Sequence, residues 1–278
     1  MSPHDAIILP QHASSRGTRV LSLANQKGGV GKTTTAINLG TALAAIGERV
    51  LIIDLDPQGN ASTGLGIDRK NRRSSTYDVM TCEKSLFGIV HDTAIPNVWL
   101  APSTLDLLGV ELEIASQKDR VTRLRNAIAT LPDGDDRFGY VLIDCPPSLN
   151  LLTINALTAS DAVVVPLQCE FFALEGLSQL IATVEQVRAA LNPRLIIQGV
   201  VLTMYDPRNN LSGQVMADVR RFMGDKVYDT VIPRNVRISE APSFGKPALL
   251  YDLKCAGSQA YLRLASEVIQ REHRLRAH

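Results

Sequence analysis

The chain has 278 residues, of which 45% are hydrophobic, with 29 Lys and Arg against 28 Asp and Glu, so its formal net charge is +1. That balance disfavours a permanently basic nucleic-acid-binding protein, although it permits a local basic patch. No apolar run is long enough to span a bilayer, and no basic segment precedes the short apolar stretch 6–9. We therefore expect a cytoplasmic protein with neither a membrane span nor a secretory signal.

Residues 1–18 are mixed polar residues with Pro and Gly, and we predict a disordered leader there, followed by one domain over 19–278. Short apolar runs then alternate with helical patterns. This alternation predicts an α/β fold with a mostly parallel, twisted sheet of about seven to eight strands and helices on both faces. Strands are expected at Val20–Ala24, Val50–Asp54, Val98–Ala101, Tyr140–Asp144, Ala162–Pro166, Ile196–Thr203 and Val227–Ile232. Helices are expected at Thr33–Ile46, Leu174–Leu191, Ser212–Met223 and about Gly257–Arg271.

The first strand leads into a glycine-rich loop and then a helix, which is the context of a P-loop. The loop and helix start read Lys27-Gly28-Gly29-Val30-Gly31-Lys32-Thr33-Thr34. Glycines let backbone N–H groups turn toward phosphate oxygens, and the helix N-terminus adds the positive end of its dipole. We expect Lys32 to reach the β- and γ-phosphates and the Thr33 hydroxyl to bind Mg²⁺. The match to GxxxxGK[ST] is imperfect, because Gln26 replaces its first glycine and Lys27 is an addition that phosphate binding does not need.

Carboxylates follow two of the other expected strands. Asp54 and Asp56 end the second strand, where ligands bind in open α/β sheets, although a turn aspartate before Pro57 is the simpler alternative. Asp144 ends the run Tyr140-Val-Leu-Ile, which is typical of a Walker B box that binds Mg²⁺ through water. The neighbouring Cys145 lacks an identifiable base and receives no catalytic role. The four cysteines are scattered and the histidines have no metal-ligand spacing, so reduced thiols and no protein-held zinc are expected.

Lys27–Thr34 resembles the deviant Walker A box of the ParA/MinD group of P-loop ATPases. The resemblance implies ATP and Mg²⁺ as cofactors, hydrolysis of ATP to ADP and phosphate, and an ATP-dependent homodimer in which Lys27 reaches the partner's nucleotide. The run Asp54–Asn60 resembles the group's Asp-x-Asp-Pro-Gln box, so Asp56 is expected to orient or activate the attacking water and Asp54 to support the Mg²⁺ region. This leaves Lys27, Lys32 and Asp56 as the expected catalytic residues.

The segment 232–237 resembles the base-contacting segment of the same group. By that resemblance Pro233 packs on the adenine and Asn235 forms a hydrogen bond near it. Composition alone indicates only a turn that enters a short helix. Together with Phe171–Gly176 and the run through Pro247, this segment is similar to ParA-type partitioning ATPases in particular, which implies a ParB-type centromere-binding partner that stimulates hydrolysis.

Three other functions are considered. A MinD-like membrane-surface ATPase that regulates placement of the division site needs an amphipathic anchor, but the apolar stripe Tyr261–Ile269 is more simply a core-packing helix. A DNA-binding scaffold with a vestigial nucleotide site conflicts with the complete set of P-loop, Mg²⁺ and water-positioning residues. An iron-protein reductase is disfavoured by the spacing of Cys145 and Cys169. We therefore expect a DNA-partitioning ATPase that makes no membrane contact.

The basic residues are unevenly distributed. Residues 204–278 hold 12 Lys and Arg against 8 Asp and Glu, whereas residues 1–203 hold 17 against 20. The candidate DNA contacts in this basic part are Arg208, Arg220, Arg221, Arg237, Lys246 and Lys254, each of which could equally be a solvated surface charge. No helix-turn-helix, zinc finger or other motif that recognises specific DNA bases accompanies them. We therefore expect non-specific binding to double-stranded DNA and association with the nucleoid. A second basic cluster, 69–73, is expected to be a solvated loop.

Overall fold

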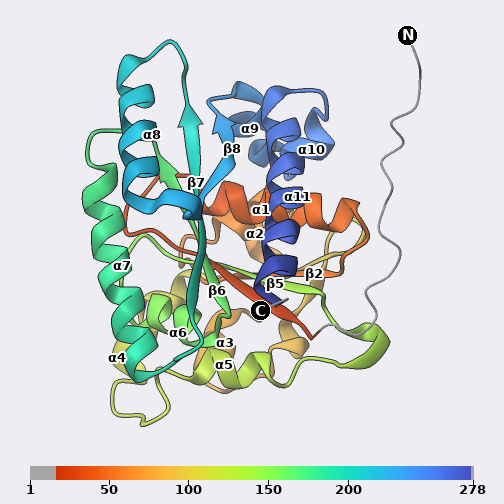
Figure 1. Ribbon diagram of the computed structural model, residues 1–278. Coiled ribbons are helices and arrows are strands. Elements are labelled where there is room, and N and C mark those ends of the chain that lie inside the picture. The colour runs from red at the N-terminus through yellow and green to blue at the C-terminus, as the bar shows by residue number, and fades with distance from the viewer. Residues whose placement is uncertain (1–16, 277–278) are drawn as a thin grey trace.

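The computed structural model describes residues 17–276, so the predicted leader lies outside the described residues except for its last two positions. One sheet has the strand order β3-β4-β2-β5-β1-β6-β7-β8 (Figure 1). The strands are β1 Arg19–Leu23, β2 Val50–Asp54, β3 His91–Asp92, β4 Val98–Ala101, β5 Tyr140–Asp144, β6 Ala162–Gln168, β7 Ile196–Tyr205 and β8 Val227–Pro233. All neighbours run parallel except β3 and β4. The predicted α/β fold is confirmed.

The seven predicted strands are all present, with ends that differ by at most two residues. Every residue of β2 and β5 is buried, as expected for strands covered on both faces. β3 was missed because it has only two residues and pairs antiparallel at the edge of the sheet. Such a short pairing leaves no periodic pattern in the sequence.

Helices form a layer on each face of the sheet (Figure 1). α1, α2, α10 and α11 contribute to one buried cluster, and α3 to α8 contribute to the other. The helices are α1 Lys32–Ala45, α2 Asn60–Gly64, α3 Thr76–Met80, α4 Val110–Glu113, α5 Arg123–Ile128, α6 Leu151–Ala159, α7 Ala173–Ala190, α8 Asn210–Met223, α9 Val236–Glu240, α10 Ala248–Tyr251 and α11 Ala256–Arg276. The four predicted helices correspond to α1, α7, α8 and α11.

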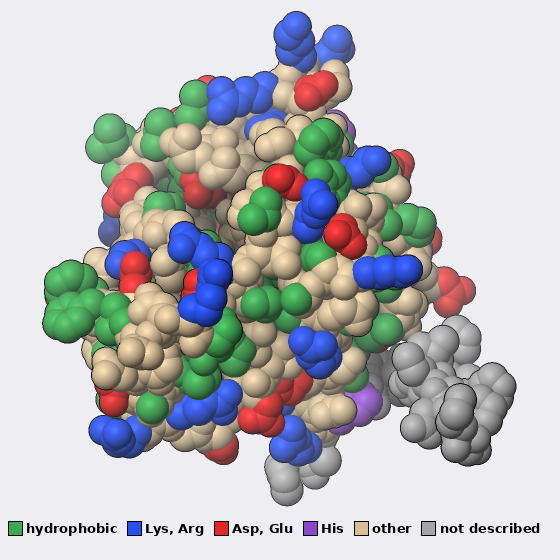
Figure 2. All heavy atoms as spheres, turned by 90° about the horizontal axis from the view of Figure 1, so that it is seen from above, with side chains coloured by type: hydrophobic (Ala, Val, Ile, Leu, Met, Phe, Trp, Pro, Cys, Tyr) green, Lys and Arg blue, Asp and Glu red, His purple; other side chains and the backbone are tan. Residues whose placement is uncertain are grey.

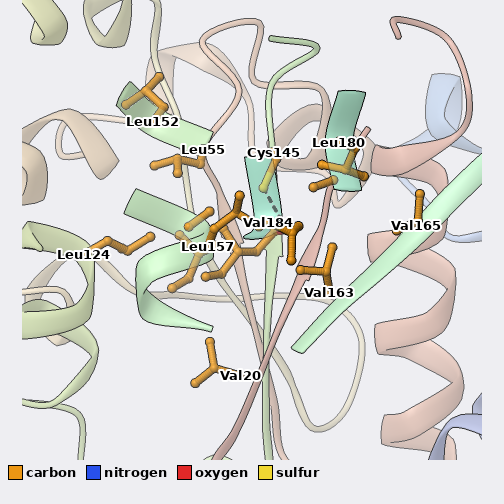
Figure 3. Close-up of a cluster of buried hydrophobic side chains, with 14 of the residues drawn as sticks. Val20, Leu55, Leu124, Cys145, Leu152, Leu157, Val163, Val165, Leu180 and Val184 are labelled. Carbon is orange, nitrogen blue, oxygen red and sulfur yellow. Dashed lines mark hydrogen bonds between the residues drawn. The ribbon is translucent and has the colours of Figure 1, made fainter. Parts of the chain in front are cut away.

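Branched side chains fill the space between the sheet and the layer that contains α6 and α7. Figure 3 shows Val163 and Val165 of β6 together with Leu157 of α6 and Leu180 of α7. All four side chains are fully buried. Full burial of such a side chain contributes about 1.5–3 kcal/mol. This packing holds the strand ends, and therefore the loops that follow them, in fixed positions.

The apolar stripe of α11 packs into the opposite cluster, as predicted for a core-packing helix. Tyr261, Leu264 and Val268 are 1%, 0% and 0% exposed. The Tyr261 hydroxyl also lies within hydrogen-bond distance of the Thr35 hydroxyl on α1, at 3.3 Å. Within residues 17–276, no helix combines the length and apolar character needed to cross a bilayer.

Candidate active site

The parallel register brings the predicted P-loop and carboxylates to one edge of the sheet. Asp144 of β5 is the register partner of Leu23 on β1 and of Asp54 on β2. The loop 24–31 follows β1 directly, so it begins beside Asp144. Three segments that are distant in sequence therefore meet at the carboxyl ends of adjacent strands, which is where open α/β sheets bind ligands.

Two glycines give the P-loop a shape that other residues rarely adopt. Gly29 and Gly31 have φ values of +75° and +91°, in the left-handed region. Gly31 is the N-cap of α1 and has no capping side chain, so the first backbone N–H groups of the helix lack a side-chain partner there. Free N–H groups at a helix N-terminus form a site for phosphate.

The loop is tied to the strands on its far side. The Thr203 hydroxyl at the end of β7 donates to the Val30 carbonyl at 2.8 Å. Asn25 donates from its amide to the Pro166 carbonyl on β6 at 2.8 Å and accepts from the backbone N–H of Lys27 at 3.0 Å. These bonds fix the loop before a ligand arrives, which reduces the entropy cost of binding.

Lys32 occupies the centre of the site. Its side chain is nearly buried, and its Nζ donates to the Lys27 carbonyl at 2.9 Å. Burial lowers the pKa of this ammonium, while the nearby carboxylates Asp144 and Asp56 oppose that shift. The amino group thus points across the loop, where it can contact phosphate oxygens.

Asp144 is fully buried, and by strict geometry its two carboxyl oxygens accept no hydrogen bond from the described residues, although the Thr33 hydroxyl lies close enough to favour the ionised form. Burial raises its pKa well above the ordinary value, the Asp54 carboxyl adds to the rise, and the Thr33 hydroxyl and Lys32 ammonium oppose it. An orphaned buried carboxylate fits a site that awaits a cation. Within residues 17–276 no three His, Cys, Asp or Glu side chains are arranged to hold a metal. Mg²⁺ typically takes one or two carboxylates and completes its coordination with phosphate oxygens and water, and the carboxyl of Asp144 could be one such ligand.

Asp54 has a different environment. One oxygen accepts from the backbone N–H and the hydroxyl of Ser62, at 2.8 and 2.6 Å, and the other accepts from the Asp56 N–H at 3.3 Å. Burial raises its pKa to about 6, the nearby Asp56 carboxylate adds to this, and the bonds from Ser62 oppose it. Asp54 therefore fixes the loop that carries Asp56, and its predicted place near Mg²⁺ remains a prediction.

Asp56 is held by its backbone, while its carboxylate remains largely available. The Ser103 hydroxyl donates to the Asp56 carbonyl at 2.6 Å, and one carboxylate oxygen accepts from the Gln58 N–H at 3.0 Å. The carboxylate of Asp56 is one of the charges near Lys32 and Asp144. A carboxylate in this position can orient a water molecule near a phosphate that Lys32 holds.

The prediction of a solvated loop at 69–73 is wrong for Arg72. Its guanidinium is buried and donates to the Ile67 carbonyl, the Thr63 hydroxyl and the Ser103 carbonyl at 2.8–3.2 Å. Arg72 therefore braces the Ser103 loop that contacts Asp56. These acceptors compensate the cost of burying the charge, which the sequence pattern did not indicate.

Lys27 has an exposed side chain. It is 42% exposed and forms an ion pair with Glu170, which is 31% exposed and lies between β6 and α7. Lys27 and Lys32 therefore belong to the same short segment but have different surroundings. Lys32 is buried in the site, whereas the side chain of Lys27 faces outward.

The predicted base-contacting residues follow β8. Pro233 ends β8 opposite Tyr205, and Asn235 caps α9 by accepting from the Arg237 N–H at 2.9 Å. The expected turn into a short helix is confirmed. The cap uses the oxygen of Asn235 and leaves its NH₂ group free to donate to a base.

The structure separates the six predicted DNA contacts into groups. Arg208 precedes α8, whereas Arg220 and Arg221 lie near the other end of that helix, about 18–20 Å along its axis. Arg237, Lys246 and Lys254 belong to the contacting segments α9 to α11. The four arginines form ion pairs with nearby carboxylates: Arg208 with Asp206, Arg220 with Asp229, Arg221 with Asp218, and Arg237 with Glu240 and Asp252. On the face that Figure 2 shows, Lys and Arg side chains are interspersed with Asp and Glu.

Several site residues were missed by sequence reasoning. Asn25 directly follows β1, so a polar residue at a strand end was an available signal. Ser62, Ser103, Thr203 and Glu170 meet the site only through tertiary structure. No local pattern marks a serine that contacts an aspartate several elements away.

Comparison with known proteins shows that the chain is similar to chromosome-partitioning proteins. A family model described as "AAA domain" matches residues 18–197. The chain is 66% identical over 259 residues to the chromosome partitioning protein ParA of Caulobacter vibrioides, covering 93% of this chain and 97% of that protein. It is 52% identical over 250 residues to the sporulation initiation inhibitor protein Soj of Bacillus subtilis, covering 90% and 98%.

Solved structures agree with this grouping. Cobyrinic acid a,c-diamide synthase from Mycobacterium smegmatis, with bound ADP and magnesium, is 38% identical with a TM-score of 0.81, covering 92% of this chain and 96% of that one. The septum site-determining protein MinD from Pyrococcus horikoshii, complexed with Mg-ADP, is 28% identical with a TM-score of 0.73, covering 90% and 96%.

The buried environment of Asp144 yields a stability prediction. We expect Asp144→Asn to raise the free energy of unfolding of the ligand-free protein by about 1–3 kcal/mol at pH 7.5, because it removes an unsatisfied buried acid. The folded state binds this proton more tightly than the unfolded state, so wild-type stability falls as pH rises from the ordinary pKa of 3.8 toward the raised value. The advantage of Asp144→Asn should therefore shrink toward acid pH.

Urea unfolding between pH 4.5 and 8 measures this difference. Asp135→Asn, at an exposed position, is the matched control and should change stability little at any pH. An Asp144→Asn protein that is less stable than wild type at pH 7.5 would contradict the assignment of an uncompensated carboxylate.

Proposed function

The chain belongs to the ParA/Soj family of chromosome-partitioning ATPases, and from this membership we propose that it acts through an ATP-driven cycle of dimerisation, DNA binding and release. It is an ATPase that uses ATP and Mg²⁺. One observation carries the proposal. The buried Lys32 lies near the carboxylates Asp56 and Asp144, whereas the side chain of Lys27 in the same loop is exposed, where a second subunit could be reached.

In the proposed site, the backbone from Lys27 to Thr34 surrounds the phosphates. Lys32 contacts the β- and γ-phosphate oxygens, and its low exposure strengthens this attraction. Pro233 packs on the adenine and the Asn235 amide donates to it. The left-handed glycines, the free helix N-terminus and the fixed loop support this assignment.

Thr33 and Asp144 are the proposed Mg²⁺ ligands, with Asp144 acting partly through water and Asp54 supporting the region through the loop it holds. When bound, Mg²⁺ neutralises charge on the phosphate oxygens. The unsatisfied oxygens of Asp144 support this fit. The Asp54 carboxylate is engaged by Ser62 and Asp56, so its contribution is to position its neighbours.

Asp56 is proposed to orient the attacking water. The water oxygen forms a bond to the γ-phosphorus while the bond from that phosphorus to the ADP oxygen breaks, the proton that the water loses ends on the phosphate product, and the products are ADP and phosphate. Such phosphoryl transfer depends mainly on positioning and charge neutralisation. The Ser103 bond to the Asp56 backbone provides this positioning.

Lys27 is proposed to contact the nucleotide of a second subunit, so that ATP joins two chains. Each dimer would then present two copies of the Arg208 loop and of the α9 to α11 segments to DNA. Binding would be non-specific and would place the protein on the nucleoid. A ParB-type partner is proposed to stimulate hydrolysis and so release the DNA.

Three substitutions test the assigned roles. Asp56→Ala should retain ATP binding and dimerisation but lose about 100-fold in hydrolysis rate, since misplacement of the attacking water costs on that order. Lys32→Ala should lose nucleotide affinity itself. Lys27→Ala should still bind nucleotide as a monomer but should lose dimerisation. Phosphate release, nucleotide titration and sedimentation measure these properties, and normal turnover by Asp56→Ala would remove its assigned role.

DNA retention with ATP, ADP or no nucleotide tests the switch. We expect retention of a random-sequence duplex only with ATP, and a steep loss of retention as salt rises, because the contacts are to phosphates. Arg208→Glu should weaken retention without changing nucleotide binding. Vesicles of anionic lipid serve as the comparison surface. ATP-dependent vesicle binding without DNA binding would instead support a MinD-like function.

A further inference from the structure

Arg72 is a buried cation that the proposed chemistry does not use. It belongs to the basic run 69–73, in which Arg69, Lys70 and Arg73 are exposed, whereas Arg72 is 7% exposed. Its guanidinium donates four hydrogen bonds, all to carbonyl or hydroxyl oxygens of neutral groups. Burying a cation among neutral groups is costly, so the position of Arg72 favours a role other than stability alone.

The four hydrogen bonds join segments that are distant in sequence. Nε and Nη2 both donate to the Ile67 carbonyl, at 3.0 and 2.8 Å, and Nη2 also donates to the Thr63 hydroxyl at 2.8 Å. Nη1 donates at 3.2 Å to the carbonyl of Ser103, which follows β4. Thr63 belongs to α2, which begins soon after Asp56. The planar fork of Arg72 therefore ties α2 to the loop after β4.

The Nη1 end of the guanidinium lies against both residues that hold the Asp56 backbone. The Asp56 carbonyl accepts from the Gly59 N–H at 2.9 Å and from the Ser103 hydroxyl at 2.6 Å. Gly59 has a φ of +64°, and a Cβ at this position would collide with Nη1 of Arg72. A displacement of Arg72 would therefore reach Asp56 in two ways, through the turn that ends at Gly59 and through Ser103.

We propose that Arg72 is a positioning residue for hydrolysis, whose guanidinium fixes the Asp56 turn against the loop after β4 and so orients the Asp56 carboxylate. The inference rests on the role proposed for Asp56 in placing the attacking water. The hydrogen bonds of Arg72 all go to residues outside the P-loop. Loss of Arg72 should therefore slow the chemical step and leave nucleotide binding intact.

Arg72→Ala tests this by separating the rate of hydrolysis from the affinity for nucleotide. We expect single-turnover hydrolysis of ATP with Mg²⁺ to slow by about tenfold or more, because small misplacements of reacting groups are costly, while the Kd for ATP changes by less than about twofold. Arg69→Ala is the matched control, since Arg69 lies on the same turn and is exposed. It should change neither property by more than about twofold. A loss of ATP affinity as large as the loss of rate would overturn the proposal.

A cavity beside Arg72 permits chemical rescue. It has a volume of about 240 Å³, and its lining includes Pro57, Gln58, Arg69 and Arg72, of which Gln58 and Arg69 are exposed. Guanidinium ion at about 20 mM, far below the molar concentrations that unfold proteins, can therefore enter Arg72→Ala from solvent. It should restore most of the lost rate and leave wild type unchanged. Arg72→Lys keeps the charge without the planar fork and should remain slow. Absence of rescue, or a full rate in Arg72→Lys, would overturn the proposed geometry.

A second route does not depend on the folding of Arg72 variants. Ser103→Ala removes the hydroxyl that donates to the Asp56 carbonyl and keeps the backbone carbonyl that Arg72 contacts. It should slow hydrolysis about as much as Arg72→Ala and leave the Kd for ATP unchanged. In the background of Asp56→Ala, Arg72→Ala should cause no further loss of rate, since both substitutions act through the same carboxylate. A further loss of about tenfold there would overturn the proposal.

Failure of this inference and failure of the proposed function give different results. If Asp56→Ala is slow while Arg72→Ala and Ser103→Ala are as fast as wild type, Asp56 keeps its role and positioning by Arg72 is overturned. If Asp56→Ala is as fast as wild type, the role of Asp56 is overturned and the inference fails with it.

Discussion

Two acidic side chains buried at neighbouring strand ends are the constraint on which the rest of the site depends. Asp54 and Asp144 are register partners and both are fully buried. Like charges in a desolvated place are costly, and their raised pKa values reflect that cost. Lys32 offsets only part of it. A divalent cation bound to phosphates, as proposed for this site, would offset the remaining cost.

The surrounding side chains give the carboxylates of Asp54 and Asp144 different hydrogen bonding. Ser62 donates two hydrogen bonds to the Asp54 carboxylate, and Asp54 thereby holds the loop that carries Asp56 in place. Arg72 and Ser103 hold the same loop from the other side. Asp144 receives no such bonds among the described residues and remains available to a cation. Differences in hydrogen bonding thus give similar residues different functions.

The same loop connects the nucleotide to the outer surface. Lys32 and Lys27 belong to one short segment, and the Nζ of the first donates to the carbonyl of the second. A nucleotide that engages Lys32 therefore acts on the backbone that carries Lys27. Lys27 in turn pairs with Glu170, which lies between β6 and α7. A change at Lys32 can therefore reach the exposed ion pair of Lys27 and Glu170 through this short path.

Much of this architecture could be predicted from the sequence, because buried parallel strands and a P-loop leave strong local signals. The strand ends at Asp54 and Asp144 were predicted to the residue. What could not be predicted was contact between distant segments. The burial of Arg72 depends on acceptors from other loops, and the near-neutral net charge conceals arginines that are already paired with carboxylates.

The most direct test of the central claim is the affinity for ATP with Mg²⁺ and with EDTA, measured by calorimetry in wild type and Asp144→Asn. If Asp144 completes a cation site, Mg²⁺ should strengthen binding to wild type by at least about tenfold, or 1.4 kcal/mol, and Asp144→Asn should lose most of that gain. Equal dependence on Mg²⁺ in the two proteins would show that the buried carboxylate does not serve the metal, and would contradict the account.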